Sequence, residues 1–184
     1  MQWTGFHGTS VYNASSIISS TFRISSREKD WLGSGAYFFI SAKGLLDPTE
    51  KAAQWASSRA PSSKPRYSFL SVLEAIIETN SFLDFDDETH IVALNLIRDE
   101  YVKIIKGQGK RPTGKMLVDK CAFCNYVMHE HDVDAIVRKE YIKTTADELD
   151  FGVDAGVPNC RVMCVKDPAA SIKSISYAVE RRRV

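Results

Sequence analysis

The alternation of hydrophobic and polar residues predicts two strands and two helices in the first third of the chain. Residues 3–8 are typical of a short strand, and Thr9 or Ser10 can cap a helix in which apolar residues recur at helical spacing. Residues 31–40 predict a buried strand, because an aromatic run follows two glycines that allow a flexible turn. A second helix begins at Asp47, a suitable N-cap, with Pro48 at its first position and Glu50 three residues after the cap.

The rest of the chain contains both the alternating pattern of strands and the three- to four-residue spacing of helices. Residues 67–78 place apolar side chains on one face of a strand and Glu74 and Glu78 on the other. Apolar residues three or four positions apart predict a helix that ends near Gly107 and another over residues 117–128. Residues 135–137 and 161–165 are typical of short strands. Because strands and helices mix without regular βαβ alternation, we predict an α+β fold.

Composition narrows the class of protein without pointing to a partner. The chain has 184 residues, of which 44% are hydrophobic, with 24 Lys and Arg against 23 Asp and Glu. These values predict one domain over residues 1–184 and give no whole-molecule attraction for polyanions. No stretch is long and apolar enough for a membrane span, and no secretory signal is recognisable, so we expect a cytoplasmic protein with reduced cysteines and no membrane contact.

Two short motifs carry the chemistry that the sequence offers. His7, Gly8 and Thr9 stand at a predicted strand-to-helix junction, where a ring nitrogen and an unobstructed backbone amide can hold a polar planar ligand. About thirty residues later, residues 33–39 (Gly-Ser-Gly-Ala-Tyr-Phe-Phe) offer an aromatic face for stacking. Each motif alone is more typical of ordinary core, and their combination and order point to a binding site.

Together these motifs resemble the NAD-dependent ADP-ribosyltransferases of the poly(ADP-ribose) polymerase and diphtheria-toxin type, in particular small bacterial toxins. The resemblance implies two packed, mainly antiparallel sheets with peripheral helices around an NAD cleft. It also implies that His7 binds the adenosine ribose, that the Gly8 backbone pairs with the nicotinamide carboxamide, and that Tyr37 stacks on the nicotinamide ring. Trp55 stands where the family has a second aromatic residue that closes the nicotinamide slot, and Thr9 and Phe38 complete the expected NAD-binding set.

The third family motif, an acidic residue or in some bacterial members Gln at the start of the last strand, is absent. Cys160 or Arg161 takes this place, which makes Arg161 a candidate for the catalytic set although it is not a carboxylate. Nicotinamide release builds positive charge on the ribose, and a carboxylate there stabilises it. Three possibilities follow. The carboxylate comes from elsewhere in the chain, with Glu74, Glu78 and Glu130 as candidates, or it comes from the acceptor or a partner protein. Otherwise the chain binds NAD without turnover. The absent acid favours mono-ADP-ribosylation over chain elongation.

The acceptor is less clear from sequence than the donor. Five basic residues without an acidic neighbour, around glycines 107, 109 and 114, can contact the phosphates of NAD, RNA or DNA or form a solvated helix end (Lys103, Lys106, Lys110, Arg111, Lys115). Residues 181–183, three arginines, extend such a patch or form a frayed tail. We therefore expect a nucleic acid, RNA above all, rather than a protein, and the resemblance implies an antitoxin partner as in toxin–antitoxin and phage-defence systems.

Two other functions and one metal site are open alternatives. A tRNA 2'-phosphotransferase has a similar His-Gly-Thr opening but lacks the Gly-x-Gly-x-Tyr-Phe run, and a catalytically inactive module could bind RNA or an antitoxin on the same fold. Cys121, Cys124, His129 and His131 have the residue types of a zinc site, but both cysteines lie on the apolar stripe of a predicted helix. We favour a plain buried helix and no metal, and treat Cys160 and Cys164 as packing residues.

Overall fold

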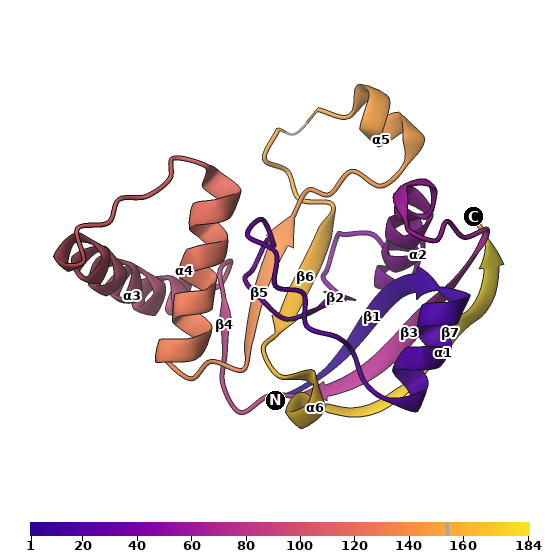
Figure 1. The fold of residues 1–184 in the computed structure, drawn as a ribbon, viewed down its shortest axis with the longest axis horizontal. Coiled ribbons are helices and arrows are strands. Elements are labelled where there is room, and N and C mark those ends of the chain that lie inside the picture. The colour runs from indigo at the N-terminus through magenta and orange to yellow at the C-terminus, as the bar shows by residue number, and fades with distance from the viewer. Residues whose placement is uncertain (154) are drawn as a thin grey trace.

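The computed structural model describes residues 1–153 and 155–184 and contains one mixed sheet of seven strands (Figure 1). The strand order is β4-β5-β6-β2-β1-β3-β7. The strands are β1 (Gln2–Ser10), β2 (Ala36–Ile40), β3 (Phe69–Glu78), β4 (Phe82–Asp84), β5 (Ala135–Glu140), β6 (Cys160–Val165) and β7 (Ile172–Arg183). The α+β class is confirmed, but the expectation of two packed sheets is wrong, because β1 and β2 pair directly and join all the strands.

The junction between β1 and β2 is short and divides the sheet into two parts. Strand β1 pairs with β3 over nine residue pairs, whereas it pairs with β2 only at Gly5 and Phe6. Residues 7–10 of β1 therefore have no strand partner on the β2 side. The sheet opens at this point, which leaves space between the two central strands.

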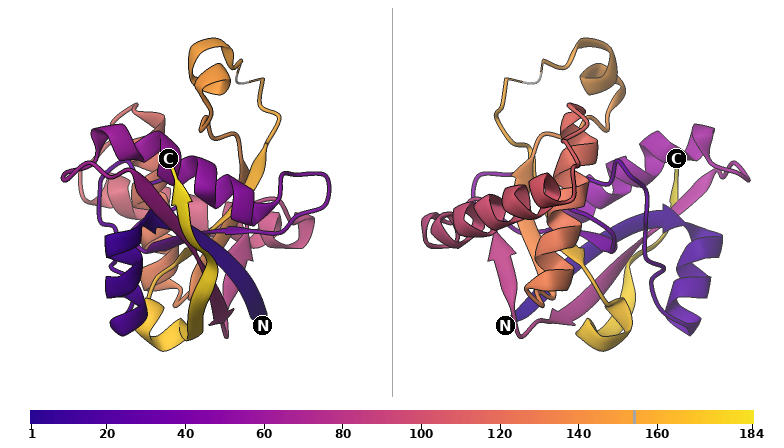
Figure 2. Two further views of the ribbon diagram at one scale, coloured as in Figure 1. Left: turned by 90° about the vertical axis from the view of Figure 1, so that its right-hand side faces the viewer. Right: turned by 60° about the vertical axis from the view of Figure 1, so that its left-hand side comes forward.

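Helices lie along the sheet and beyond its ends (Figure 2). They are α1 (Val11–Ser19), α2 (Pro48–Arg59), the 3₁₀ turn η1 (Ala60–Ser62), α3 (Glu88–Gly107), α4 (Met116–Glu130), α5 (Ala146–Phe151) and α6 (Pro168–Ser171). The predicted caps are confirmed: the Ser10 side chain accepts from the Asn13 amide, and Asp47 accepts from the amides of Thr49 and Glu50. The segment that carries α5 projects beyond the rest of the molecule.

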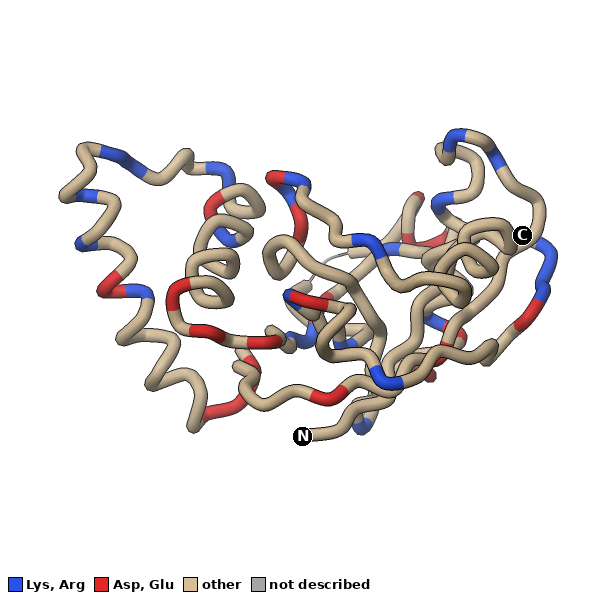
Figure 3. The backbone as a smooth tube through the Cα atoms, turned by 60° about the horizontal axis from the view of Figure 1, so that its bottom comes forward, with Lys and Arg blue, Asp and Glu red and all other residues tan. Residues whose placement is uncertain are grey.

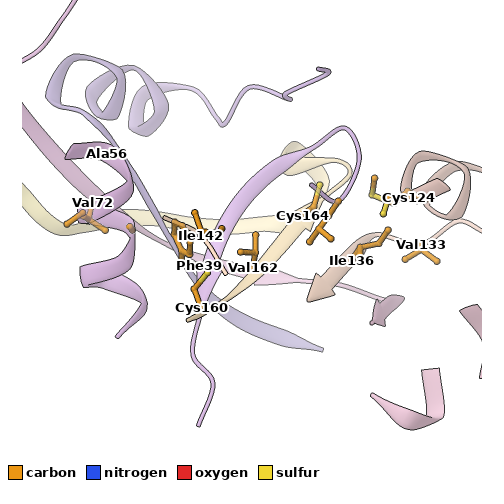
Figure 4. Close-up of a cluster of buried hydrophobic side chains, with 14 of the residues drawn as sticks. Phe39, Ala56, Val72, Cys124, Val133, Ile136, Ile142, Cys160, Val162 and Cys164 are labelled. Atoms are coloured by element: carbon orange, nitrogen blue, oxygen red, sulfur yellow. The ribbon is translucent and has the colours of Figure 1, made fainter. Parts of the chain in front are cut away.

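Strands β2 and β6 are buried on both faces, because successive side chains of a strand point to opposite sides and each side is covered by a hydrophobic cluster. On β2, Phe39 packs into one cluster with α2 and α4, while Phe38 and Ile40 pack into another cluster with α1. Strand β6 divides in the same way, with Val162 in the first cluster and Met163 in the second. Figure 4 shows the first cluster, in which residues from both parts of the sheet lie together.

Among the described residues, five elements have no counterpart in the sequence prediction: β4, β7, η1, α5 and α6. Strand β7 is the largest of them and forms one edge of the sheet beside β3. The alternative of a frayed tail over residues 181–183 is wrong, because Arg182 and Arg183 pair with Leu70 and Phe69 of β3. Among the described residues, no helix is long and apolar enough to cross a membrane.

Candidate functional site

A cleft of about 1680 Å³ lies where β1 and β2 diverge. Its walls come from β1, the start of α1, the loop before β2, strand β2, the C-terminal half of α2 and the loop that leads to β3. All six residues that the sequence suggests for NAD binding line this one cleft: His7, Gly8, Thr9, Tyr37, Phe38 and Trp55. They come from three separate elements, so their assembly is a result of the fold and not of sequence proximity.

His7 is held in one protonation state and one orientation. Its Nδ1 lies 2.9 Å from the backbone oxygen of Tyr37, which can only accept, so Nδ1 carries the hydrogen and donates. Burial lowers the pKa of His7 below its usual value, which keeps the ring neutral at pH 7. The rings of Phe22 and Phe38 lie 5.2 Å and 6.1 Å from the imidazole and support it. Nε2 is therefore left as a hydrogen-bond acceptor, suited to a ligand hydroxyl.

Tyr37 presents a ring that is fixed by its hydroxyl. The hydroxyl donates to the backbone oxygen of Gly33 over 2.6 Å and accepts from the Leu32 amide over 2.8 Å. Burial, together with the nearby Cys164 and Asp30, raises the pKa of Tyr37 far above its usual value. The hydroxyl thus serves to hold the loop before β2, and the ring is the part of Tyr37 that can contact a ligand.

Trp31 is a site residue that the sequence did not indicate. Its ring lies 6.2 Å from that of Tyr37 and 5.1 Å from that of Trp55, edge-on to both. The Trp55 ring is also covered by the guanidinium of Arg59 at 4.0 Å. The aromatic wall of the cleft consequently has three rings, with Trp31 between the two that were predicted.

Gly8, Thr9 and Phe38 line the cleft with different degrees of access. A Cβ on Gly8 would lie 1.8 Å from the backbone oxygen of Ala52, so the close contact between β1 and α2 requires glycine. Thr9 Oγ1 accepts from the side chain of Asn13 over 3.4 Å. Phe38 is only 1% exposed and packs against Phe22 and His7, which makes it a support for the imidazole.

Arg161 does not line the cleft. Its guanidinium forms an ion pair with the buried carboxylate of Asp84 and lies 5.8 Å from the Trp3 ring, on the other side of the sheet from Val162, which does line the cleft. Cys160 is 2% exposed, and burial raises the pKa of its thiol to about 12. The structure therefore gives Arg161 a packing environment, and the Cys160 thiol is protonated at neutral pH.

The cleft contains two carboxylates that the sequence did not suggest, Glu28 and Asp30. Asp30 Oδ2 accepts from the Ser25 hydroxyl over 2.7 Å and from the Arg27 amide over 2.9 Å, and its charge adds to the raised pKa of Tyr37. The three carboxylates suggested by sequence are not part of the lining: Glu74, Glu78 and Glu130. Glu78 instead lies 3.9 Å from Lys173, and Glu74 pairs with Phe6 and Ser176 in the sheet.

The cleft carries an excess of positive charge. Six basic residues line it against the two carboxylates: Arg23, Arg27, Lys29, Arg59, Lys64 and Arg66. Burial, and to a lesser extent the nearby charge of Arg27, lower the pKa of Arg59. The lysines between residues 103 and 115 belong to α3 and the α3–α4 loop, at the opposite end of the molecule from α2 (Figure 1), and do not line the cleft.

A buried lysine fixes the segment between β5 and β6. Lys51 of α2 is 0% exposed, and its Nζ donates to the Ile142 oxygen over 2.7 Å and to Thr144 Oγ1 over 2.9 Å. Glu148 Oε2 lies 3.6 Å from the same nitrogen. Burial raises the pKa of Glu148, but hydrogen bonds from the amides of Thr144 and Thr145 and the charge of Lys51 outweigh it and lower this pKa to about 2. The start of α5 is thereby tied to the helix that carries Trp55.

The residues of the alternative zinc site are not brought together. Cys121 and Cys124 lie on the buried face of α4, and burial raises the pKa of the Cys124 thiol to about 12. His131 lies beyond the end of α4, where its Nε2 is 3.6 Å from Glu100. Among the described residues, no group of three His, Cys, Asp or Glu side chains is arranged to hold a metal ion. Cys121 and Cys124 therefore act as packing residues here.

No protein-family model matches this chain, and no curated protein matches it at a significant level. The kind of ligand that the cleft can bind is therefore inferred from the residues that line it. It offers a neutral imidazole acceptor, an aromatic wall, two carboxylates and several guanidinium groups in one space. This set suits a ligand with hydroxyls, an aromatic ring and phosphates.

Proposed function

We propose that this chain is an NAD-dependent mono-ADP-ribosyltransferase. The observation that carries the proposal is the single cleft lined by all six residues of the expected NAD-binding set, with His7 fixed as a neutral acceptor by Tyr37. In the proposed complex, His7 Nε2 accepts from an adenosine ribose hydroxyl, and the ring of Tyr37 stacks on nicotinamide. The C1'–N bond to nicotinamide breaks, a bond from C1' to an acceptor atom forms, and a proton is released.

Asp30 is our choice for the carboxylate that stabilises the positively charged ribose. It lines the cleft and interacts electrostatically with Tyr37, whereas Arg161 is paired with Asp84 elsewhere. A carboxylate aimed at developing positive charge lowers the barrier most when it is already fixed before the reaction. The bonds from Ser25 and Arg27 fix one oxygen of Asp30 in this way.

Arg27 and Arg59 are our choice for the diphosphate of NAD. Both line the cleft, and a guanidinium group binds phosphate through two parallel hydrogen bonds. Two guanidinium groups in one cleft suit a group with two adjacent phosphates better than they suit a single carboxylate. Arg59 also covers Trp55, so phosphate and ring contacts would form together.

Release of nicotinamide from labelled NAD is the experiment that tests this function, with the label followed into RNA, DNA and protein. We expect turnover by the wild type and loss of it in Tyr37→Ala and His7→Ala, with Tyr126→Ala on α4 as a matched control outside the cleft. Asp30→Asn should lower kcat by about 100-fold, since loss of a single preorganised electrostatic group costs this much in other enzymes. Glu28→Gln should have a much smaller effect.

The same experiment separates the alternatives. Removal of a phosphate from 2'-phosphorylated RNA would favour the tRNA 2'-phosphotransferase. A folded protein that releases no nicotinamide with any acceptor, and that binds RNA or an antitoxin equally well after Tyr37→Ala, would favour the binding module. Label in one macromolecular fraction, absent with Tyr37→Ala, supports the transferase and identifies the acceptor class. An antitoxin, where present, is expected to cover the cleft and prevent turnover.

A further inference from the structure

A strip of basic residues with an exposed aromatic ring leads out of the cleft. It consists of Lys64 and Arg66 in the loop after α2, Phe69 at the start of β3, and Arg181 and Arg183 at the end of β7, and we call it the basic strip. Residues 59–69 contain no acidic residue. The sheet brings its two parts together, because Phe69 pairs with Arg183. In Figure 3 the loop after α2 and the end of β7 lie beside each other near the C-terminus, both with blue segments.

The strip is a fixed surface and not a pair of loose chain ends. The Tyr67 hydroxyl donates to the Ala56 oxygen over 2.5 Å, which holds the loop against α2. The Val184 amide donates to the Ser68 oxygen over 3.0 Å, which closes the edge of the sheet. The Arg181 guanidinium lies 4.0 Å from the Phe69 ring, so charge and aromatic surface are adjacent. A ligand would therefore meet an ordered arrangement.

The charges of the strip are not neutralised within the protein. Arg182, whose side chain points to the other face of β7, forms an ion pair with Glu50 of α2 at 2.6 Å. In the part of the chain that the structure describes, none of the four cations of the strip has such a partner. All four are exposed, and Phe69 is 38% exposed. An external polyanion is the natural complement to this surface.

The cleft and the strip are continuous. Lys64, Arg66 and Phe69 line the outer part of the cleft, and Arg181 and Arg183 lie beyond it. A volume of about 1680 Å³ exceeds the range of roughly 300–1,000 Å³ that is usual for a pocket that holds one small ligand. Phosphate-binding cations also extend past the two guanidinium groups that suit the NAD diphosphate. The site thus has room and charge for a second, extended substrate.

We propose that the basic strip binds single-stranded nucleic acid and guides it into the cleft as the acceptor of ADP-ribose. Cations that follow a backbone, next to an exposed ring on which an unpaired base can stack, form the usual surface for a single strand. A duplex would offer phosphates but no free base for Phe69. The acceptor role, unlike the binding, rests on the proposed transferase function. In that step an oxygen or nitrogen of the strand bonds to C1' of the ribose, nicotinamide leaves and one proton is released.

Binding is tested without NAD by fluorescence anisotropy with labelled 12-residue oligouridylate, oligothymidylate, a 12-base-pair DNA duplex and polyglutamate. We expect the two single strands to bind at least tenfold more tightly than the duplex and polyglutamate. The two single strands distinguish RNA from DNA as the source of the same chemistry. Duplex or polyglutamate binding as tight as that of the single strands would overturn the proposal.

Two charge-matched variants locate the surface. The first variant replaces all four cations of the basic strip: Lys64→Gln/Arg66→Gln/Arg181→Gln/Arg183→Gln. It should weaken oligouridylate binding at least tenfold. The slope of log affinity against log salt should become shallower by roughly 2–3, because each lost phosphate contact to a single strand changes the slope by about 0.7. Lys103→Gln/Lys106→Gln/Lys110→Gln/Arg111→Gln removes equal charge from α3 and the α3–α4 loop and should change binding less than threefold. The reverse result would transfer the site to the α3–α4 loop and refute the strip.

Phe69→Ala separates stacking from charge. Loss of one base–aromatic contact should weaken binding roughly five- to hundredfold while the salt slope stays unchanged. Thermal melting of every variant shows whether it is folded, and the Phe69→Leu variant keeps the apolar packing if the alanine variant unfolds. Binding unaffected by either substitution would contradict the stacking role.

Turnover distinguishes failure of the strip from failure of the transferase. The Arg181→Gln/Arg183→Gln variant, which changes no residue of the cleft lining, should release nicotinamide from NAD at the wild-type rate without acceptor, but transfer at least threefold less label to oligonucleotide. Wild-type protein that binds oligouridylate but never cleaves NAD would refute the transferase and leave the strip. Wild-type protein that labels protein and not nucleic acid would refute the strip as the acceptor path.

Discussion

Replacement of Gly8 by alanine tests the contact on which the cleft is built. An added Cβ would lie 1.8 Å from the Ala52 oxygen and 3.1 Å from the Ala56 Cβ, whereas ordinary contact begins near 3.4 Å. Helix α2 must therefore move away from β1 by about 1.6 Å, because the first of these atoms belongs to the backbone. Overpacking of this kind costs about 3 kcal/mol, at the upper end of the usual range.

The consequence is measurable in stability and in activity. For a chain of this length, about 3 kcal/mol lowers the Tm by roughly 6–12 °C. The same movement carries Trp55 and Arg59 away from Tyr37, so we expect a higher KM for NAD in nicotinamide release. Gly107→Ala is the matched control, because no atom lies within 4 Å of its added Cβ and alanine is favoured in a helix by about 0.5–1 kcal/mol.

A Gly8→Ala variant that melts within 2 °C of the wild type would show that α2 does not lie against β1 as described. Normal stability combined with lost NAD turnover would instead point to a direct role of the Gly8 backbone in ligand binding. Lost stability with an unchanged KM would separate the packing of α2 from the site. Each outcome is distinguishable because melting and turnover are measured on the same preparation.

Three further substitutions test other contacts. Tyr37→Phe removes the hydroxyl that binds the buried Leu32 amide and the Gly33 carbonyl, and should lower the free energy of unfolding in urea by about 1–3 kcal/mol. Nicotinamide release should stay measurable because the ring remains. An unchanged free energy of unfolding would contradict the role of the hydroxyl. The pKa of Glu148 is lowered from 4.5 to about 2, so its contribution to stability is complete above pH 4.5 and is lost as pH falls toward 2. Glu148→Gln should lack this part of the acid loss in Tm, and identical pH profiles would count against it. Arg161→Met leaves the Asp84 carboxylate unpaired and should cost about 3 kcal/mol, with turnover retained well below its Tm; an inactive but folded variant would return Arg161 to the catalytic set.

Elements with regular spacing were predictable, and the edge strand was not. The caps at Ser10 and Asp47 and the helix that ends at Gly107 follow from local rules, since each depends on residues close in sequence. Strand β7 lacks a period of two: its partly buried residues Ile172, Ile175 and Val179 are three and four positions apart. The reason is structural, because the pairing of β3 with β7 shifts register at three places along their length.

The site was predictable where a motif marks it and not where the fold alone supplies a residue. His7 and Tyr37 belong to motifs, Trp55 was expected from the resemblance, and the structure brings all three into one cleft. Trp31 and Asp30 lie in an irregular loop whose path follows no periodic pattern. Arg161 was expected in the catalytic set from its position at the start of β6, but this position does not determine which face of the sheet the side chain occupies. In the structure it pairs with Asp84, away from the cleft.

The short seam between β1 and β2 has a thermodynamic consequence. Two residue pairs, Gly5 with Ile40 and Phe6 with Phe39, carry the backbone connection between a three-strand part and a four-strand part, and the cleft opens directly beside them. A ligand that touches both His7 on β1 and Tyr37 on β2 would act as a crosslink across this seam, and would slow hydrogen exchange along both central strands. Binding would then raise the melting temperature by mass action, about 2.7 kcal/mol of added stability at one hundred times Kd. The protein would be most rigid only while its substrate is in place.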